Sequence, residues 1–219
     1  MKFSKEDIKE AMLLYAITDR RWLKEGQTLT QVCKAVIENG ATCLQIREKE
    51  LGEKEFTDEA IQLRKLCNDA KVPFIVNDSI ETAVASGADG LHVGQTDIKG
   101  RNIRKIIGND MILGISASTV QEAVAAQKAG ADYIGVGAVF ETGTKDDAPA
   151  ISMEQLKDII TAVDIPAVVI GGITAQNMSV FKGTGIAGIS VISAIFAADD
   201  PGKATAMLRE KAGEIIDNG

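Results

Sequence analysis

Short apolar runs rich in Val and Ile alternate along the chain with longer amphipathic stretches. A short apolar run is typical of a strand buried on both faces, whereas an amphipathic stretch of helical length is typical of a surface helix. The alternation therefore predicts repeated strand and helix units around a parallel sheet. We expect eight strands, at residues 13–18, 43–47, 73–77, 90–93, 111–116, 133–140, 167–173 and 188–195.

A repeated motif supports this count. A glycine, a brief turn and an apolar run recur at Gly40, Gly87, Gly130 and, in weaker form, Gly185. Each glycine can end a helix in the left-handed conformation before an even-numbered strand. The fourfold recurrence and the even count favour a closed barrel over an open doubly wound sheet. We predict the α/β class, with residues 1–219 as a single (β/α)8 TIM-barrel domain and an extra N-terminal helix at residues 4–11 covering its bottom.

Charge and hydropathy narrow the function classes. The net charge is -7, and no run of Lys and Arg occurs, which argues against a general nucleic-acid binder. The N-terminus is charged, its first apolar run is too short for a signal peptide, and no stretch could span a bilayer. We expect a cytoplasmic protein with small-molecule partners, no nucleic acid and no membrane. The sequence carries no signal that fixes an oligomeric state.

The three cysteines are Cys33, Cys43 and Cys67. They fall inside helix-like or strand-like segments without the spacing of a metal site. We expect reduced, buried thiols rather than disulfides or metal ligands.

In a barrel of this type the active site lies at the carboxyl ends of the strands, so polar residues after the apolar runs are candidates. Arg47 and Lys49 alternate along the end of the second strand and could grip a diphosphate from one side. The alternative is that both are solvated surface cations. Further polar candidates at strand ends are Gln45, Asn77, Gln95 and Ser116.

Two carboxylates follow neighbouring strands. Asp78 comes after the third strand and Asp97 after the fourth, so the two could share one Mg2+ that also contacts diphosphate oxygens. Lone aspartates are more often helix caps, and Asp78 could instead cap the helix that begins near Ser79.

A second anion site is indicated at the last two strands. Gly172 brings bare backbone to the barrel mouth, and Ile192 and Ser193 lead into a short turn after the eighth strand. The glycines could also serve only a tight turn. The loop after the sixth strand adds Thr142, Thr144 and Lys145, which could surround phosphate oxygens, although their spacing is not that of a P-loop. Two anion sites imply two phosphorylated reactants.

Three further residues have open roles. His92 is the only histidine, and a buried, hydrogen-bonded structural role is favoured over acid–base catalysis. Tyr15 and Trp22 could line a pocket for a flat ring, or could serve packing.

Taken in order along the chain, these motifs resemble the thiamin-phosphate synthase family. The matching segments are Gln45-Ile-Arg-Glu-Lys49, Asn77-Asp78, Gly90-Leu-His-Val-Gly-Gln-Thr-Asp97, Gly114-Ile-Ser116, Thr142-Gly-Thr-Lys145, Gly171-Gly-Ile173 and Val191-Ile-Ser-Ala-Ile195. The chain departs from the family at Ala138 and Glu141, where proline is frequent, and at Glu81, where aspartate is frequent.

The resemblance implies transfer of a pyrimidinylmethyl group from hydroxymethylpyrimidine diphosphate to hydroxyethylthiazole phosphate, with release of pyrophosphate. It implies diphosphate binding by Arg47, Lys49, Asn77 and Lys145, and Mg2+ binding by Asp78 and Asp97. It also implies pyrimidine contacts from Gln45 and Ser116. The thiazole phosphate would then contact Thr142, Thr144, Gly172, Ile192 and Ser193. Of these residues, Arg47, Lys49, Ser116 and Lys145 are the expected catalytic groups.

Three rival functions remain open. A thiazole tautomerase shares the framework but does not need the complete diphosphate and metal set. A noncatalytic sensor of thiamin precursors would keep both anion sites without turnover. Another phosphosugar barrel, such as an epimerase, would want acid–base residues at strand ends.

Overall fold

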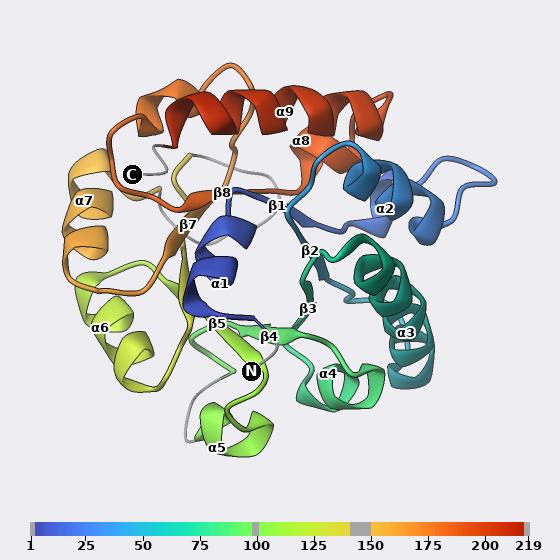
Figure 1. Cartoon of the computed structure of the whole chain (residues 1–219), viewed down its shortest axis with the longest axis horizontal. Helices are drawn as coiled ribbons and strands as arrows, with labels where there is room; N and C mark the ends of the chain where they lie inside the picture. The colour runs from blue at the N-terminus through green and yellow to red at the C-terminus, as the bar shows by residue number, and fades with distance from the viewer. Residues whose placement is uncertain (1–2, 98–100, 141–149, 217–219) are drawn as a thin grey trace.

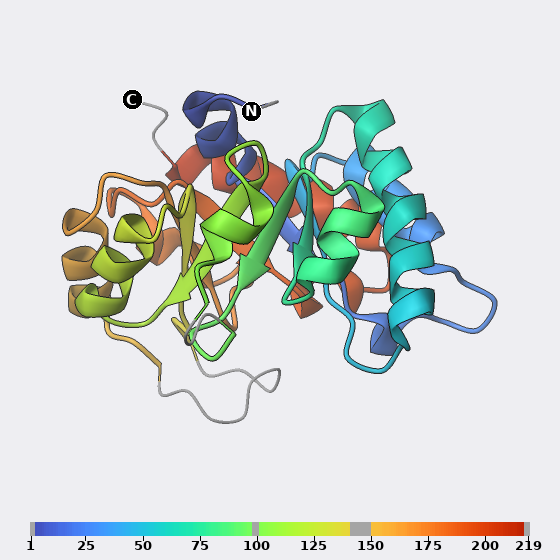
Figure 2. The same cartoon turned by 90° about the horizontal axis from the view of Figure 1, so that it is seen from below.

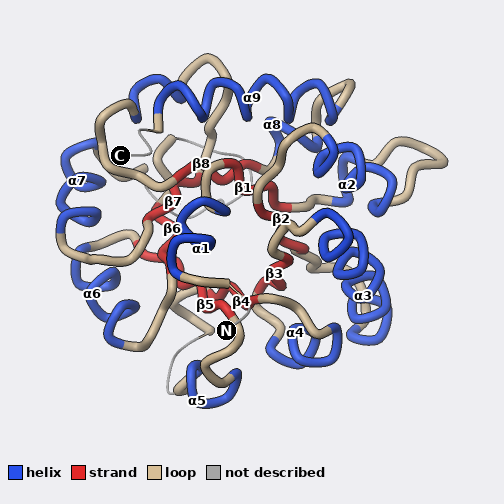
Figure 3. Tube along the Cα trace, viewed as in Figure 1, coloured by secondary structure: helices blue, strands red, loops and turns tan. Residues whose placement is uncertain are grey.

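The computed structural model describes residues 3–97, 101–140 and 150–216. Eight parallel strands pair in chain order, and β8 pairs with β1, so the sheet closes into a barrel as the sequence predicts. Figure 3 shows the ring of strands inside a ring of helices. The strands are β1 Leu14–Ile17, β2 Cys43–Ile46, β3 Phe74–Asn77, β4 Gly90–Val93, β5 Ile112–Ala117, β6 Tyr133–Val136, β7 Ala167–Ile170 and β8 Gly188–Val191.

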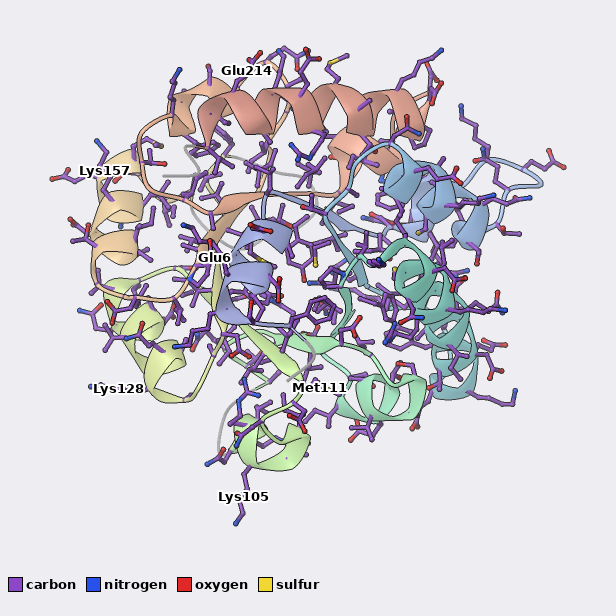
Figure 4. All side chains as sticks on the ribbon, viewed as in Figure 1. Glu6, Lys105, Met111, Lys128, Lys157 and Glu214 are labelled. Carbon is purple, nitrogen blue, oxygen red and sulfur yellow. The ribbon has the colours of Figure 1, made fainter. Side chains whose placement is uncertain are left out.

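The helices cover the outside of this barrel (Figure 1). Lysines and a glutamate on four of them (Lys105, Lys128, Lys157 and Glu214) extend away from the barrel (Figure 4). Only the short 3-10 helix η2 (Met178–Phe181) lies between β7 and β8. The remaining elements are α1 Lys5–Ala11, η1 Arg20–Trp22, α2 Leu29–Glu38, α3 Glu53–Ala70, α4 Ile80–Ser86, α5 Ile103–Ile107, α6 Val120–Lys128, α7 Met153–Thr161, α8 Ser193–Phe196 and α9 Pro201–Ile215.

Helix α1 closes one end of the barrel. It begins with a capping box, in which Ser4 and Asp7 satisfy each other's backbone N–H groups. Its apolar face includes Ile8, which joins Met12 and Tyr15 in the core inside the barrel. Figures 1 and 2 show α1 across the amino-terminal end of the strands. The opposite end, where the strands finish, is left for a site.

The strands are buried on both faces, which explains their nearly continuous apolar sequence. In β2, Cys43 belongs to the core inside the barrel, whereas Leu44 belongs to the larger core between barrel and helices. Neither side chain of this pair is exposed to solvent. Successive strand residues therefore supply two separate cores.

Three of the four recurring glycines end helices as expected. Gly40, Gly87, Gly130 and Gly185 all have positive φ, but Gly185 lies in the loop before β8, because η2 already ends at Phe181. Gly87 is the C-cap of α4, with φ +64°, where a residue with a side chain would be strained.

The C-terminal ends of three strands were predicted several residues too far along the chain. β6 ends at Val136, β7 at Ile170 and β8 at Val191, rather than at residues 140, 173 and 195. The apolar run continues past each strand because the following residues are also buried: Ile173 is 5% exposed in a loop, and Ile195 is fully buried in α8. Burial rather than strand pairing therefore sets the length of these runs.

The three cysteines are buried and free, as expected. Burial raises the pKa of all three thiols, that of Cys67 to about 12. No helix in the described ranges is long and apolar enough to cross a membrane.

Candidate active site

The carboxyl ends of the strands surround a cavity of about 390 Å3. This is large enough for a small organic ligand. Tyr15, His92 and Gln95 line it, and so do the ten described residues that were predicted to bind substrate or metal: Gln45, Arg47, Lys49, Asn77, Asp78, Asp97, Ser116, Gly172, Ile192 and Ser193. The fold brings these ten residues together from six different strand ends, although they span about 150 positions of the chain. Thr142, Thr144 and Lys145 lie outside the described residues.

The cationic side of the cavity carries Arg47 and Lys49. The Arg47 side chain is half-buried and the Lys49 side chain is exposed, and both line the cavity. The backbone N–H of Arg47 donates to the hydroxyl of Thr18 at the end of β1, with an N to Oγ1 distance of 3.0 Å. The loop after β2 is therefore tied to the neighbouring strand.

Between these two cations, Glu48 points away from solvent. Its side chain is 2% exposed, and its Oε2 accepts a 2.8 Å hydrogen bond from Arg20 Nε. Burial raises the pKa of Glu48, although the hydrogen bond from Arg20 opposes that shift. Arg20 also pairs with Glu59 of α3. Glu48 thus fixes the middle of the cation-bearing loop to η1 and α3.

The two candidate metal ligands lie at the same mouth. The Asp97 carboxylate accepts a 2.9 Å hydrogen bond from the backbone N–H of Gly94, which closes the turn after β4. Asp78 has φ +62°, and its backbone N–H donates to the carbonyl of His92. Ser79, not Asp78, caps α4, so the helix-cap alternative for Asp78 is wrong. Asp78 instead adopts a strained backbone conformation at the cavity, which is common at functional sites.

The opposite side of the cavity is formed by backbone. Gly171 and Gly172 both have positive φ, and a Cβ at Gly171 would lie 2.6 Å from Cβ of Ala138. The Gly172 carbonyl accepts a 2.9 Å hydrogen bond from Asn177 Nδ2. This turn therefore has the close packing that only glycine allows. Ser193 begins helix α8 rather than the short turn expected from the sequence.

The inner wall of the cavity is polar, and Tyr133 is the residue in its hydrogen-bond network that sequence reasoning missed. Gln45 Nε2 donates to the hydroxyl of Tyr15 (2.6 Å), which bonds to the hydroxyl of Tyr133 (2.8 Å). His92 Nδ1 lies 3.0 Å from the Tyr133 hydroxyl, and His92 Nε2 lies 3.0 Å from Ser116 Oγ. Burial raises the pKa of both tyrosines well above the ordinary value, so their hydroxyls remain neutral.

Two residues that line the cavity, His92 and Ser190, were not predicted to face it. His92 is half-buried and lines the cavity, so it is not the fully buried residue that we expected. Ser190 is 3% exposed, and its Oγ has no hydrogen-bond partner among the described residues. The signal that could have found both is the period of two along β4 and β8, which directs alternate side chains into the barrel.

The fold and the cavity define a (β/α)8 barrel with side-chain cations, carboxylates and bare backbone gathered at the carboxyl ends of its strands. That arrangement is typical of barrel enzymes that act on phosphorylated small molecules.

Comparison with known proteins identifies the family. The family described as thiamine monophosphate synthase matches residues 14–195. The thiamine-phosphate synthase of Ruminiclostridium cellulolyticum is 49% identical over 187 residues, covering 85% of this chain and 89% of that protein. The thiamine-phosphate synthase of Clostridium botulinum is 43% identical, covering 92% and 94%. The solved structure of thiamine phosphate pyrophosphorylase from Pyrococcus furiosus has a TM-score of 0.87 and 37% identity, covering 95% and 99%. The chain belongs to the thiamine monophosphate synthase family.

Proposed function

We propose that the protein joins hydroxymethylpyrimidine diphosphate to hydroxyethylthiazole phosphate, which gives thiamin phosphate and pyrophosphate. The observation that carries this proposal is the layout of one cavity. Cations and carboxylates line one side, bare backbone lines the opposite side, and hydrogen-bonding side chains line the wall between them. Such a cavity suits two anionic reactants that meet over a polar ring site. We further propose that residues 1–219 act as one catalytic unit.

The roles divide among the described residues as follows. Arg47, Lys49 and Asn77 hold the diphosphate, because cations and amide donors pair with phosphate oxygens. Gln45 and Ser116 bind the pyrimidine ring. Backbone at Gly172, together with Ile192 and Ser193, receives the thiazole phosphate. Thr142, Thr144 and Lys145, outside the described residues, complete the two anion sites.

The carboxylates fit a magnesium ion. Mg2+ prefers oxygen ligands and is commonly held by one or two carboxylates together with substrate phosphates and water. In the described part of the chain, no group of three or more metal-ligating side chains occurs, so Asp78 and Asp97 would be a minimal set that relies on substrate oxygens. When bound, Mg2+ would neutralise charge on the departing pyrophosphate.

The chemistry then requires no side-chain nucleophile. The C–O bond between the pyrimidinylmethyl carbon and the diphosphate breaks, and its electron pair leaves with pyrophosphate. A C–N bond forms between that carbon and the thiazole ring nitrogen, which supplies the new electron pair. Arg47 and Lys49 stabilise the charge that develops on the leaving group, while the electron-rich aminopyrimidine delocalises the positive charge on carbon. Positioning of the two reactants supplies the remaining rate enhancement.

The test is pyrophosphate release by the purified protein with both substrates, with each substrate alone, and with Mg2+ or EDTA. We expect release, and thiamin phosphate as product, only when both substrates and the metal are present. Arg47→Met should lower the rate at least about tenfold, the equivalent of one charge-assisted hydrogen bond. Lys54→Met is the matched control, because Lys54 is an exposed cation on α3 that pairs with Asp58 along the same helix and does not line the cavity. Binding of either substrate without turnover would instead support the tautomerase or the sensor.

A further inference from the structure

A continuous chain of hydrogen bonds crosses the interior of the barrel. It runs from Gln45 through Tyr15, Tyr133 and His92 to Ser116, and no adjacent pair in it is more than 3.0 Å apart. Gln45 and Ser116, its two ends, line the cavity, whereas Tyr133 is not among the described residues that line it. Tyr15 and His92 line the cavity as well, so the chain connects cavity-lining groups through Tyr133, which does not line it.

The backbone leaves room for this chain. A Cβ at Gly114 would lie 2.2 Å from the Tyr133 ring and 2.5 Å from His92 Nδ1, and a Cβ at Gly135 would lie 3.1 Å from the His92 ring. Gly114 in β5 and Gly135 in β6 thus make space for the rings of His92 and Tyr133. The centroids of these two rings lie 5.5 Å apart. The carbonyl of Ser116 is held separately, by a 2.6 Å hydrogen bond from Gln95 Nε2.

The direction of the protons follows from counting donors. Gln45 Nε2 donates to Tyr15, so the hydroxyl proton of Tyr15 needs another acceptor. If it goes to Tyr133, then Tyr133 donates to His92 Nδ1, and the imidazole proton sits on Nε2 and is donated to Ser116. In the reverse direction Tyr15 receives two donors, and its own proton is left for the thiol of Cys43, a weak acceptor. The first direction leaves over only the Ser116 hydroxyl proton, which lies at the cavity where water or a ligand can accept it, whereas the reverse leaves a proton in the barrel interior.

We propose that His92 is a positioning residue: held by Tyr133 as the Nε2–H tautomer, it turns the Ser116 hydroxyl proton into the cavity. Gln45 uses one of its two amide N–H groups on Tyr15, so its carbonyl oxygen and its second N–H remain for a ligand. The chain thereby presents a donor at Ser116. It selects a ring that offers an unprotonated ring nitrogen to Ser116, and it disfavours a ring whose nitrogen there carries a proton, as in the oxygen analogue of the aminopyrimidine.

This inference deepens the proposed function and rests on it for the identity of the ring. The proton direction does not depend on activity and has its own test. His92 is the only histidine, so 15N-histidine labelling gives the nitrogen signals of this one ring. We expect a proton on Nε2 and none on Nδ1 at neutral pH. Tyr133→Phe should shift chiefly the Nδ1 signal, and Ser116→Ala chiefly the Nε2 signal. A proton on Nδ1, or on both nitrogens, would overturn the proposal.

Ligand selection is tested by binding, which does not require turnover. The probes are the pyrimidine diphosphate and its analogue with oxygen in place of the exocyclic amine, measured by calorimetry. We expect the folded wild type to bind the amine at least about tenfold more tightly, and Tyr133→Phe to lose most of that preference while its affinity for the thiazole phosphate stays within about twofold. Thr205→Val, which removes a buried hydroxyl bonded to Pro201 within α9, is the control and should keep the preference. If Tyr133→Phe weakened binding of the pyrimidine diphosphate and of the thiazole phosphate equally, the positioning role would be overturned. If the wild type preferred the amine over its oxygen analogue but showed no turnover, only the proposed function would be overturned.

Discussion

Arg20 Nε donates a 2.8 Å hydrogen bond to Glu48 Oε2, and Glu48 lies between the two cations that face the cavity. The Arg20 side chain is 28% exposed. It is not among the described residues that line the cavity. The pair therefore acts on the site through the backbone of the loop after β2, by holding Arg47 and Lys49 in place. It links a buried carboxylate to the proposed diphosphate site without contacting the substrate.

Arg20→Met tests this link. The variant leaves Glu48 buried without its partner, so the loop should loosen. We expect the KM for the pyrimidine diphosphate to rise about fivefold, the equivalent of about 1 kcal/mol, with little change in the KM for the thiazole phosphate. Steady-state kinetics with each substrate varied in turn measure both values. Lys54→Met is again the matched control, and equal changes in both KM values would contradict the assignment.

Much of the fold could be predicted from the sequence because burial on both faces leaves a clear apolar signature. The eight strands and the helix over residues 4–11 follow from that signature and from the recurring glycines. The ends of β6 to β8 could not, because residues such as Ile173 are buried in loops and look like strand residues. The residues at the mouth of the cavity could be predicted, because polar residues that directly follow an apolar run are found from their position along the chain alone.

The inner wall of the cavity is a different problem. The hydroxyls of Tyr15 and Tyr133 meet 118 residues apart in the sequence, and no local pattern encodes that pairing. A tyrosine in an apolar strand reads as core, and both tyrosines are indeed buried. Their hydrogen-bonding role depends on closure of the barrel, which places β1 and β6 across one interior.

Replacement of glycine by alanine should have opposite effects on the free energy of unfolding at Gly114 and at Gly213. Gly114→Ala would bring a methyl group onto Tyr133 and His92 inside the barrel, and we expect a loss of about 1–3 kcal/mol in the free energy of unfolding. Gly213 lies in α9, where the side-chain atom nearest to an added Cβ is the flexible end of Arg209 at 3.5 Å, and we expect Gly213→Ala to gain about 0.5–1 kcal/mol. Denaturant unfolding measures both values. Equal destabilisation by the two variants would contradict the interior packing described above.

Asp19 predicts a pH dependence of stability. Its carboxylate accepts hydrogen bonds from the side chain and backbone of Arg21, and chiefly the side-chain bonds lower the pKa of Asp19 below 3.8. Between the folded and the unfolded pKa of Asp19, the unfolded state binds more protons than the folded state. The stabilisation is therefore present above about pH 4 and is lost as the pH falls through the folded pKa. Asp19→Asn should melt a few degrees below the wild type at pH 6, with the difference shrinking as the pH falls below about 4. A constant difference across this range would contradict the assignment. Asp58→Asn, on the exposed face of α3, is the control.

Asp78 and Asp97 make the sharpest prediction about the metal. Asparagine tolerates the left-handed backbone better than alanine does, so Asp78→Asn removes the charge while keeping the φ of +62°. Asp97→Asn likewise keeps an oxygen for the Gly94 N–H. We expect each variant to raise the Mg2+ concentration for half-maximal activity at least about tenfold, because the minimal carboxylate set leaves no other described side chain to replace the lost ligand. Titration of activity with Mg2+, beside melting curves that show an intact fold, measures the effect. If either variant kept the Mg2+ dependence of the wild type, that carboxylate would not be a ligand, and the positive φ at Asp78 would need an origin other than metal binding.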